Sequence, residues 1–153
     1  MLHYCFHFSP TLTHILISPQ ASPYPYSHER VDFVVSTHAK DPLVFVEIKD
    51  NQWADNANRQ LKVDIQMRNR FKDMANRCCA PHLWGLSILG TRLQVYVCNI
   101  AEGEVTPPCL ARPNPYLCIL DEFLAGAWGI DITSQEGFEC LRGIVADVVT
   151  NLT

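Results

Sequence analysis

Two opposite charges stand at the end of a strongly apolar run of the chain. The stretch LVFVEIKD, from Leu43 to Asp50, alternates with the period of two that is typical of a β-strand. That period places Glu47 and Lys49 on the same face of the predicted strand, after two apolar residues. A carboxylate and an ammonium arranged in this way are suited to general acid–base or electrostatic catalysis.

A third charge, Asp32, lies in the preceding apolar run RVDFVVS. If the two runs form a hairpin with a symmetric connection, Phe33 faces Val46 and Asp32 faces Glu47. Directly opposed residues have Cβ atoms roughly 4.5–5.5 Å apart, so the two carboxylates would repel each other unless a cation lies between them. Hard oxygen ligands suit Mg²⁺ or Mn²⁺. Lys49 could then act on a metal-bound water or stabilise charge that develops on a phosphate.

A plainer interpretation of the same residues remains open. A strand that leaves the core often ends in charged residues that water solvates. In that case Glu47 and Lys49 are exposed, pair with their own neighbours and lie far from Asp32.

The predicted helix over residues 55–77 concentrates positive charge. It carries six of the twelve Lys and Arg residues of the chain, against three Asp. We therefore expect it to face a phosphate backbone, with Arg59, Lys62, Arg68 and Arg70 as contacts. The alternative is a surface helix with internal ion pairs, because Asp64 precedes Arg68 by four residues and Asp73 precedes Arg77 by four.

The remaining elements follow from periodicity and from turn residues. We predict strands over residues 11–17, 30–36 and 43–49, a helix over 55–77, a hairpin over 83–99 that turns at Gly90-Thr91, and a second helix that begins near Ser134. Residues 18–30 and 101–115 are Pro-rich and are expected to be loops, while residues 116–128 could be helix or strand. The order predicts an α/β (or α+β) fold with a central mixed sheet of four to five strands flanked by helices.

The two helices should bury apolar stripes. For the first helix we expect the buried residues Ala57, Leu61, Ile65, Phe71 and Met74. For the second helix we expect Phe138, Leu141, Val145 and Val148 on one side.

Composition indicates one globular domain, residues 1–153. The net charge of −4 argues against a protein that coats nucleic acid indiscriminately. Seven cysteines, an odd number without a C-x-x-C pair, favour reduced thiols in an intracellular protein of the nucleus or cytoplasm. The apolar N-terminal segment lacks the basic residues of a signal peptide, and no run is long enough for a membrane helix.

Four features of the chain, taken in order, resemble the PD-(D/E)XK nuclease superfamily. They are Asp32, then Glu47-Ile48-Lys49 at the end of the next strand, then a helix with Gln60, and then a further strand. The resemblance covers residues 30–99, and the segment 116–153 would be a C-terminal helical extension. The Gln on the helix resembles the Gln that is typical of the RecB-like branch of this superfamily. The segments SHERVDFVV, VEIKD and WGLSILGTRLQVYV resemble the sequences of fungal proteins of the same type.

The resemblance implies a restriction-endonuclease-like core that hydrolyses phosphodiester bonds of nucleic acid, with DNA as the expected substrate. It implies that Asp32 and Glu47 bind Mg²⁺ or Mn²⁺, that Lys49 assists the attacking water and that Gln60 orients the site, with Gln66 as a weaker substitute. The first helix of the family has no clear counterpart in this chain. An inactive nuclease-fold module that binds nucleic acid or a protein partner is therefore the alternative.

Overall fold

A computed structural model describes residues 15–20, 32–112 and 114–152 of the chain, and its core is one mixed, open β-sheet. The sheet has seven strands in the order β1-β2-β3-β4-β5-β6, and β7 pairs with the beginning of β5, whereas β6 pairs with its end. Strands β3 and β4 are parallel, and the other neighbours are antiparallel. The strands are β1 (Ile15–Gln20), β2 (Asp32–Thr37), β3 (Pro42–Lys49), β4 (His82–Leu89), β5 (Arg92–Asn99), β6 (Glu104–Thr106) and β7 (Ile130–Asp131).

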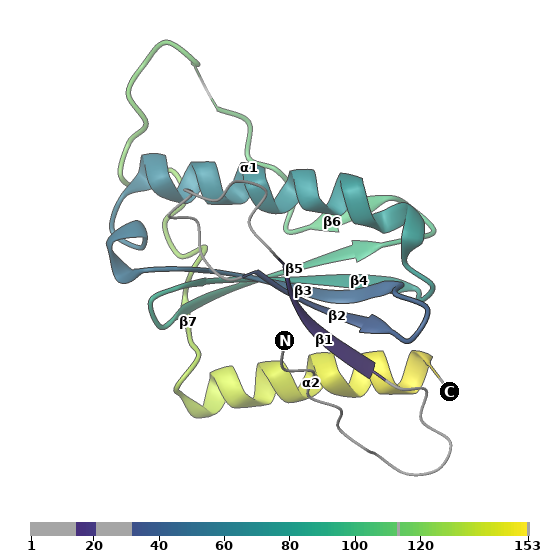
Figure 1. Ribbon diagram of the computed structural model, residues 1–153. Helices are drawn as coiled ribbons and strands as arrows, with labels where there is room; N and C mark the ends of the chain where they lie inside the picture. The colour runs from purple at the N-terminus through teal and green to yellow at the C-terminus, as the bar shows by residue number, and fades with distance from the viewer. Residues whose placement is uncertain (1–14, 21–31, 113, 153) are drawn as a thin grey trace.

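One long helix covers each face of the sheet (Figure 1). Helix α1 (Ala57–Met74) makes the crossover between β3 and β4, which a parallel strand pair requires. The short 3₁₀ helices η1 (Asn51–Trp53) and η2 (Ala75–Arg77) lie before and after it. Helix α2 (Gln135–Asn151) lies against the opposite face. Neither α1 nor α2 combines the length and apolarity that crossing a membrane would need, and these are the long helices of the described chain.

The predicted α/β class with a mixed sheet and two flanking helices is confirmed, but the sheet is larger than predicted. Strands β6 and β7 are only three and two residues long, and β6 falls within a segment that we expected to be a loop. Of the strand predicted over residues 11–17, residues 11–14 lie outside the described part of the chain, and β1 extends past residue 17 into the predicted loop. Residues 116–128 form turns, so the expected helical extension is limited to α2.

Helix α1 packs on the sheet through Val63, Met67, Phe71 and Met74, which are buried. The predicted stripe was right at Phe71 and Met74 but wrong at Ile65, which is 48% exposed. Ile65 lies about 200° around the helix from Val63 at 100° per residue, so the two side chains cannot share a face.

The predicted face of α2 was partly wrong. Val148 is buried, but Phe138 and Val145 are 57% and 61% exposed. Gly137 explains the rotation, because a Cβ at this position would lie 2.4 Å from the carbonyl oxygen of Asp131. The missing side chain lets the first turn of α2 approach the end of β7, and this turns Ile144 and Val148 toward the sheet.

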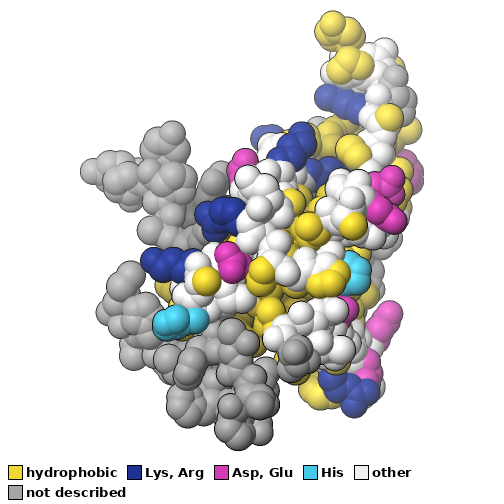
Figure 2. Space-filling model, turned by 90° about the vertical axis from the view of Figure 1, so that its right-hand side faces the viewer, with side chains coloured by type: hydrophobic (Ala, Val, Ile, Leu, Met, Phe, Trp, Pro, Cys, Tyr) yellow, Lys and Arg dark blue, Asp and Glu magenta, His cyan; other side chains and the backbone are white. Residues whose placement is uncertain are grey.

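Between β6 and β7 the chain leaves the sheet and projects beyond α1 (Figure 1). This extension, residues 107–128, carries exposed hydrophobic side chains that Figure 2 shows at the top of the molecule: Leu110, Tyr116, Leu117 and Leu120. Its last residues return to the core, where Leu124 and Trp128 are buried on the α1 side.

Gly85 in β4 allows α1 to approach the sheet. A Cβ added there would lie 2.8 Å from the ring atom Cζ of both Phe45 and Phe71.

We expect Gly85→Ala to lower the free energy of unfolding by about 1–3 kcal/mol, because it overpacks this contact. The matched control is Gly143→Ala in α2, where a Cβ meets nothing within 4 Å. That change should raise the free energy of unfolding by about 0.5–1 kcal/mol through helix propensity. Urea denaturation followed by circular dichroism measures both, and equal effects of the two changes would contradict this packing.

Candidate active site

Glu47 and Lys49 are buried together at the end of β3. Their exposed fractions are only 2% and 6%, and the Lys49 Nζ lies 3.0 Å from the Glu47 Oε1. They share the sheet face of Phe45, which α1 covers, and β3 is flanked by β2 and β4. The alternative interpretation, a solvated strand end, predicted that Glu47 and Lys49 are exposed, and this is wrong because both residues are buried.

Arg70 of α1 brings a second cation to the same carboxylate. Its Nε lies 3.8 Å from the Glu47 Oε2, and its side chain is 29% exposed. Ion pairs buried in this way usually cost stability relative to apolar residues of similar volume. Burial of this ion pair is thus weak evidence for a stabilising role, and we take the cluster of Glu47, Lys49 and Arg70 as the candidate functional site.

The backbone register supports the pairing that was predicted for Asp32. Phe33 pairs with Val46 and Val34 with Phe45, as expected from the symmetric connection. The register shifts only beyond Val35, toward the turn. The β2–β3 pairs end at Phe33 and Val46, and the same register continued by one residue would set the backbone of Asp32 opposite that of Glu47. The side chain of Asp32 lies outside the described part of the structure.

The basic residues of α1 divide between different sides of the helix. Arg59, Gln66 and Arg70 fall on one stripe, because seven and eleven residues correspond to about two and three full turns. Arg68 lies on the opposite side. Lys62 is exposed, about 60° from this stripe. The stripe borders the Glu47–Lys49 cluster, since Arg70 reaches Glu47 and Arg59 lies over Trp53.

Arg68 binds inside the protein instead of facing outward as a nucleic-acid contact would. Its guanidinium donates two hydrogen bonds to Asp64, at 2.9 and 3.1 Å, and one to the carbonyl oxygen of Pro107 at 3.0 Å. The Tyr96 hydroxyl donates to Asp64 at 3.0 Å. Burial and the Asp64 carboxylate hold the pKa of Tyr96 well above its usual range, so the hydroxyl remains a donor at physiological pH. The predicted Asp64–Arg68 pair is confirmed, while no ion pair joins Asp73 to Arg77 within the described chain.

Removal of Arg68 should therefore affect stability. We expect Arg68→Ala to lower the free energy of unfolding by about 3 kcal/mol, because it leaves the buried Asp64 carboxylate without its cation. Lys72→Ala on the exposed side of the same helix serves as the control and should change stability little. Chemical denaturation of both variants measures the difference, and an equal response would show that the Asp64 network contributes nothing.

Gln60 does not lie on the stripe that borders the cluster. Its side-chain amide donates to the carbonyl oxygen of Ala54 at 2.6 Å and so links α1 to the end of η1. Gln66 lies on that stripe, and its Oε1 is buried without a hydrogen-bond partner in the described structure. Of the two glutamines considered from the sequence, Gln66 is thus better placed to contact a ligand of the cluster.

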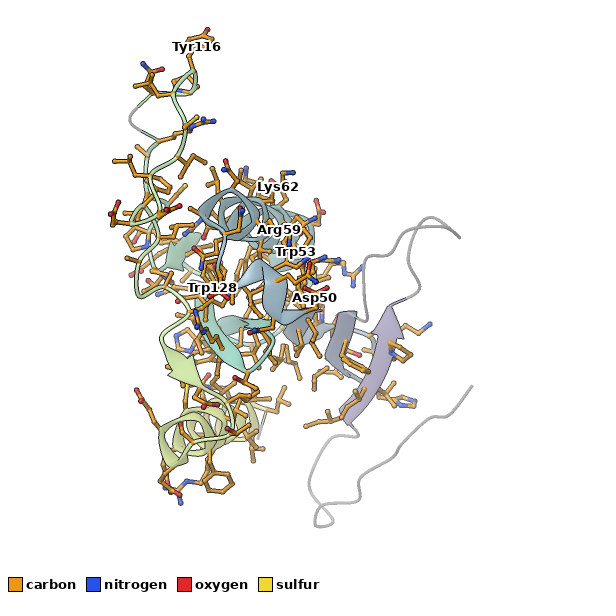
Figure 3. The ribbon with its side chains drawn as sticks, turned by 90° about the vertical axis from the view of Figure 1, so that its left-hand side faces the viewer. Asp50, Trp53, Arg59, Lys62, Tyr116 and Trp128 are labelled. Carbon is orange, nitrogen blue, oxygen red and sulfur yellow. The ribbon has the colours of Figure 1, made fainter. Side chains whose placement is uncertain are left out.

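Trp53 stands at the edge of the site and was not among the principal predicted residues. Its ring, which is partly buried, has the Lys49 Nζ at 5.4 Å and the Arg59 Cζ at 5.7 Å from its centroid. Figure 3 shows Arg59, Trp53 and Asp50 in succession below Lys62 on this side of the molecule. An aromatic residue directly after the motif strand is the sequence feature that indicates this position.

The neighbouring strands continue the polar row and were missed from the sequence. Ser87 in β4 pairs with Glu47 and with Gln94 in β5, so the three residues cross the sheet on one face. Ser87 is fully buried, and the Trp128 Nε1 donates to its Oγ at 3.1 Å. Period-two alternation in LWGLSILG would have placed Ser87 on the inner face, but only the parallel register puts it beside Glu47.

The donors match a divalent cation in kind but not in number. Glu47 supplies the hard carboxylate oxygens that Mg²⁺ or Mn²⁺ prefers. Among the described residues, however, no group of three His, Cys, Asp or Glu side chains comes together to hold a metal ion. A complete site at the end of β3 would need Asp32 as well as Glu47.

Comparison with known proteins adds no identification. No protein-family model, no curated protein and no solved structure matches the chain.

Proposed function

We propose that the protein is a metal-dependent nuclease of the PD-(D/E)XK type that hydrolyses phosphodiester bonds in DNA. The observation that carries the proposal is the buried Glu47–Lys49 pair at the end of a strand, beside a helix that crosses to a parallel strand. In the proposed assignment β1 to β4 with α1 are the restriction-endonuclease-like core. The cysteine content supports a place inside the cell, in the nucleus or cytoplasm.

The cluster has the charge that phosphodiester hydrolysis requires. Lys49 and Arg70 both contact the buried Glu47 carboxylate. With Asp32 as a second carboxylate, the two cations would balance the two anions, and a bound divalent ion would give the site its positive charge. Such preorganised charge stabilises the negative charge that builds up on the phosphate oxygens. Lys49 would hold its proton at Nζ and donate it as a hydrogen bond to one of these oxygens.

Glu47 and Asp32 would hold Mg²⁺ or Mn²⁺, which when bound polarises the phosphate and acidifies the attacking water. In the overall reaction the water oxygen forms a new bond to phosphorus, and the bond from phosphorus to the leaving deoxyribose oxygen breaks. The attacking water loses one proton and the leaving oxygen takes up one proton, so no net proton is gained or lost in the bond exchange. Arg59 and Lys62 would contact the phosphates that flank the one attacked.

A second candidate is an inactive nuclease-fold module that binds nucleic acid or a protein partner. Two contacts favour it. Lys49 already neutralises Glu47 at 3.0 Å, and the Gln60 amide is bound to Ala54 instead of the cluster. Both candidate functions are compatible with the same fold, and a measurement of metal binding distinguishes between them.

Calorimetric titration with Mn²⁺ tests the metal site. We expect saturable heat for the wild-type protein and its loss in Glu47→Gln, which keeps the shape of the side chain but removes the charge. Glu139→Gln, which alters an exposed carboxylate paired with Arg142 on α2, is the matched control and should bind Mn²⁺ as the wild type does. Equal heat from wild type and Glu47→Gln would contradict the metal role of Glu47 and favour the inactive module.

A further inference from the structure

The short helix η1, which carries Trp53, is anchored at both ends and on one side. The Asp50 side chain accepts a hydrogen bond from the Gln52 backbone N at 3.0 Å, which caps η1. The Gln60 amide fixes the far end of η1 at Ala54. On the other side the β4–β5 turn packs against η1, since a Cβ on Gly90 would lie 2.7 Å from the Asn51 Oδ1. These contacts position the backbone that carries Trp53, and its partly buried ring packs against the hydrophobic core at the edge of the Glu47–Lys49 cluster.

The two cations near the ring differ in burial and in their partners. Lys49 is buried and paired with Glu47. Within the described residues, the Arg59 guanidinium makes one exposed hydrogen bond, from its Nη1 to the carbonyl oxygen of Gln52 at 3.2 Å, and lies over the Trp53 ring. A guanidinium on an aromatic face at a partly exposed position can give up that face to another planar group and move to a nearby anion.

We propose that Trp53 is a stacking platform for an unpaired nucleobase, so that the site takes single-stranded DNA. This inference rests on the proposed function, because it makes the cluster the site of the scissile phosphate. Bases inside a duplex have both faces covered by their neighbours, so a ring fixed beside the buried Lys49 can stack only on a base that has left the helix. With a base on Trp53, Arg59 is released to bind the adjacent phosphate.

Tryptophan fluorescence tests the proposal without cleavage. The protein is titrated in EDTA with short oligothymidylate, with a blunt duplex of similar length and with oligouridylate. Trp128 is buried, and Trp84 lies on the α2 side with its Nε1 bound to Asp147, so quenching that disappears in Trp53→Phe reports on Trp53. We expect oligothymidylate to quench the wild type and the duplex to leave it unchanged.

Affinity measured by fluorescence anisotropy of a labelled oligothymidylate completes the test. Trp53→Leu should weaken binding roughly five- to a hundredfold, the range for loss of one stacked base, and Trp53→Phe should weaken it less. Phe138→Leu, an exposed aromatic change on α2, is the matched control and should have no effect. Thermal unfolding of each variant confirms that it is folded.

The outcomes separate this inference from the proposed function. Quenching by oligothymidylate in a protein that never cleaves DNA would support the platform and overturn the nuclease. Cleavage of duplex DNA that Trp53→Leu leaves unchanged would support the nuclease and overturn the platform. Binding of the duplex as tightly as the single strand, or unaltered affinity in a folded Trp53→Leu, would also overturn the platform. Quenching by oligouridylate alone would show that the platform serves RNA and would overturn the choice of DNA.

Discussion

Glu47→Ala is expected to lower the free energy of unfolding by about 3–5 kcal/mol in metal-free buffer, the usual result of removing one partner of a buried ion pair. Lys49, only 6% exposed, loses the carboxylate that lies 3.0 Å from its Nζ, and Arg70 loses the same partner. Urea denaturation in EDTA measures the effect. Glu139→Ala on the surface of α2 is the control and should change stability by less than about 1 kcal/mol.

The double variant Glu47→Ala/Lys49→Met should recover most of the stability that Glu47→Ala loses. An apolar side chain then fills the site, and no buried lysine remains without a carboxylate. If the single and double variants unfold at the same urea concentration, the Glu47–Lys49 pair is not a coupled buried unit. That result would show that burying Glu47 and Lys49 together does not cost the protein stability.

Lys49→Met is the substitution with the largest expected effect on rate. It should reduce cleavage of DNA by about a hundred- to a thousandfold, the loss typical of removing one preorganised donor to a developing negative charge. The loss should fall on kcat and leave KM nearly unchanged, because Lys49 is buried at the cluster and lies away from the exposed basic surface. Steady-state cleavage of a labelled oligonucleotide measures both constants.

Lys72→Ala provides the matched control for this prediction. Lys72 is exposed in the last turn of α1 and touches none of the cluster residues described above, so its removal should leave kcat unchanged. A Lys49→Met protein that is folded and cleaves at the wild-type rate would exclude a catalytic role for Lys49.

The sequence predicted the strand geometry of the site well. Period-two alternation put Glu47 and Lys49 on one face, and the symmetric connection gave the pairing of Phe33 with Val46 that the structure contains. Both depend on local properties, namely strand periodicity and the length of one loop. Burial of the two charges depends instead on the crossover helix above them, so the pattern alone left the solvated strand end open.

Features that depend on how elements are rotated or packed could not be predicted in the same way. Gly137 sets the rotation of α2 through one backbone contact, and so Phe138 points outward although it belongs to an apolar stripe. Ser87 joins the polar row only through the parallel register of β3 and β4. The division between Arg68 and Arg70 was accessible in principle, since residues two apart lie about 200° apart on a helix. Which of the two arginines lies near Glu47 depends on which side of α1 faces the sheet, and that is known only from the folded structure.

Cleavage of DNA offered both as single strands and as supercoiled plasmid tests the central claim most directly. The purified protein is incubated with each DNA in Mg²⁺ and in EDTA, beside Glu47→Gln and Glu139→Gln prepared in the same way. We predict cleavage of the single strands by wild type and Glu139→Gln in Mg²⁺ alone, with no cleavage by Glu47→Gln. Equal cleavage by wild type and Glu47→Gln, or both DNAs intact in every sample, would contradict a nuclease site at Glu47 and Lys49.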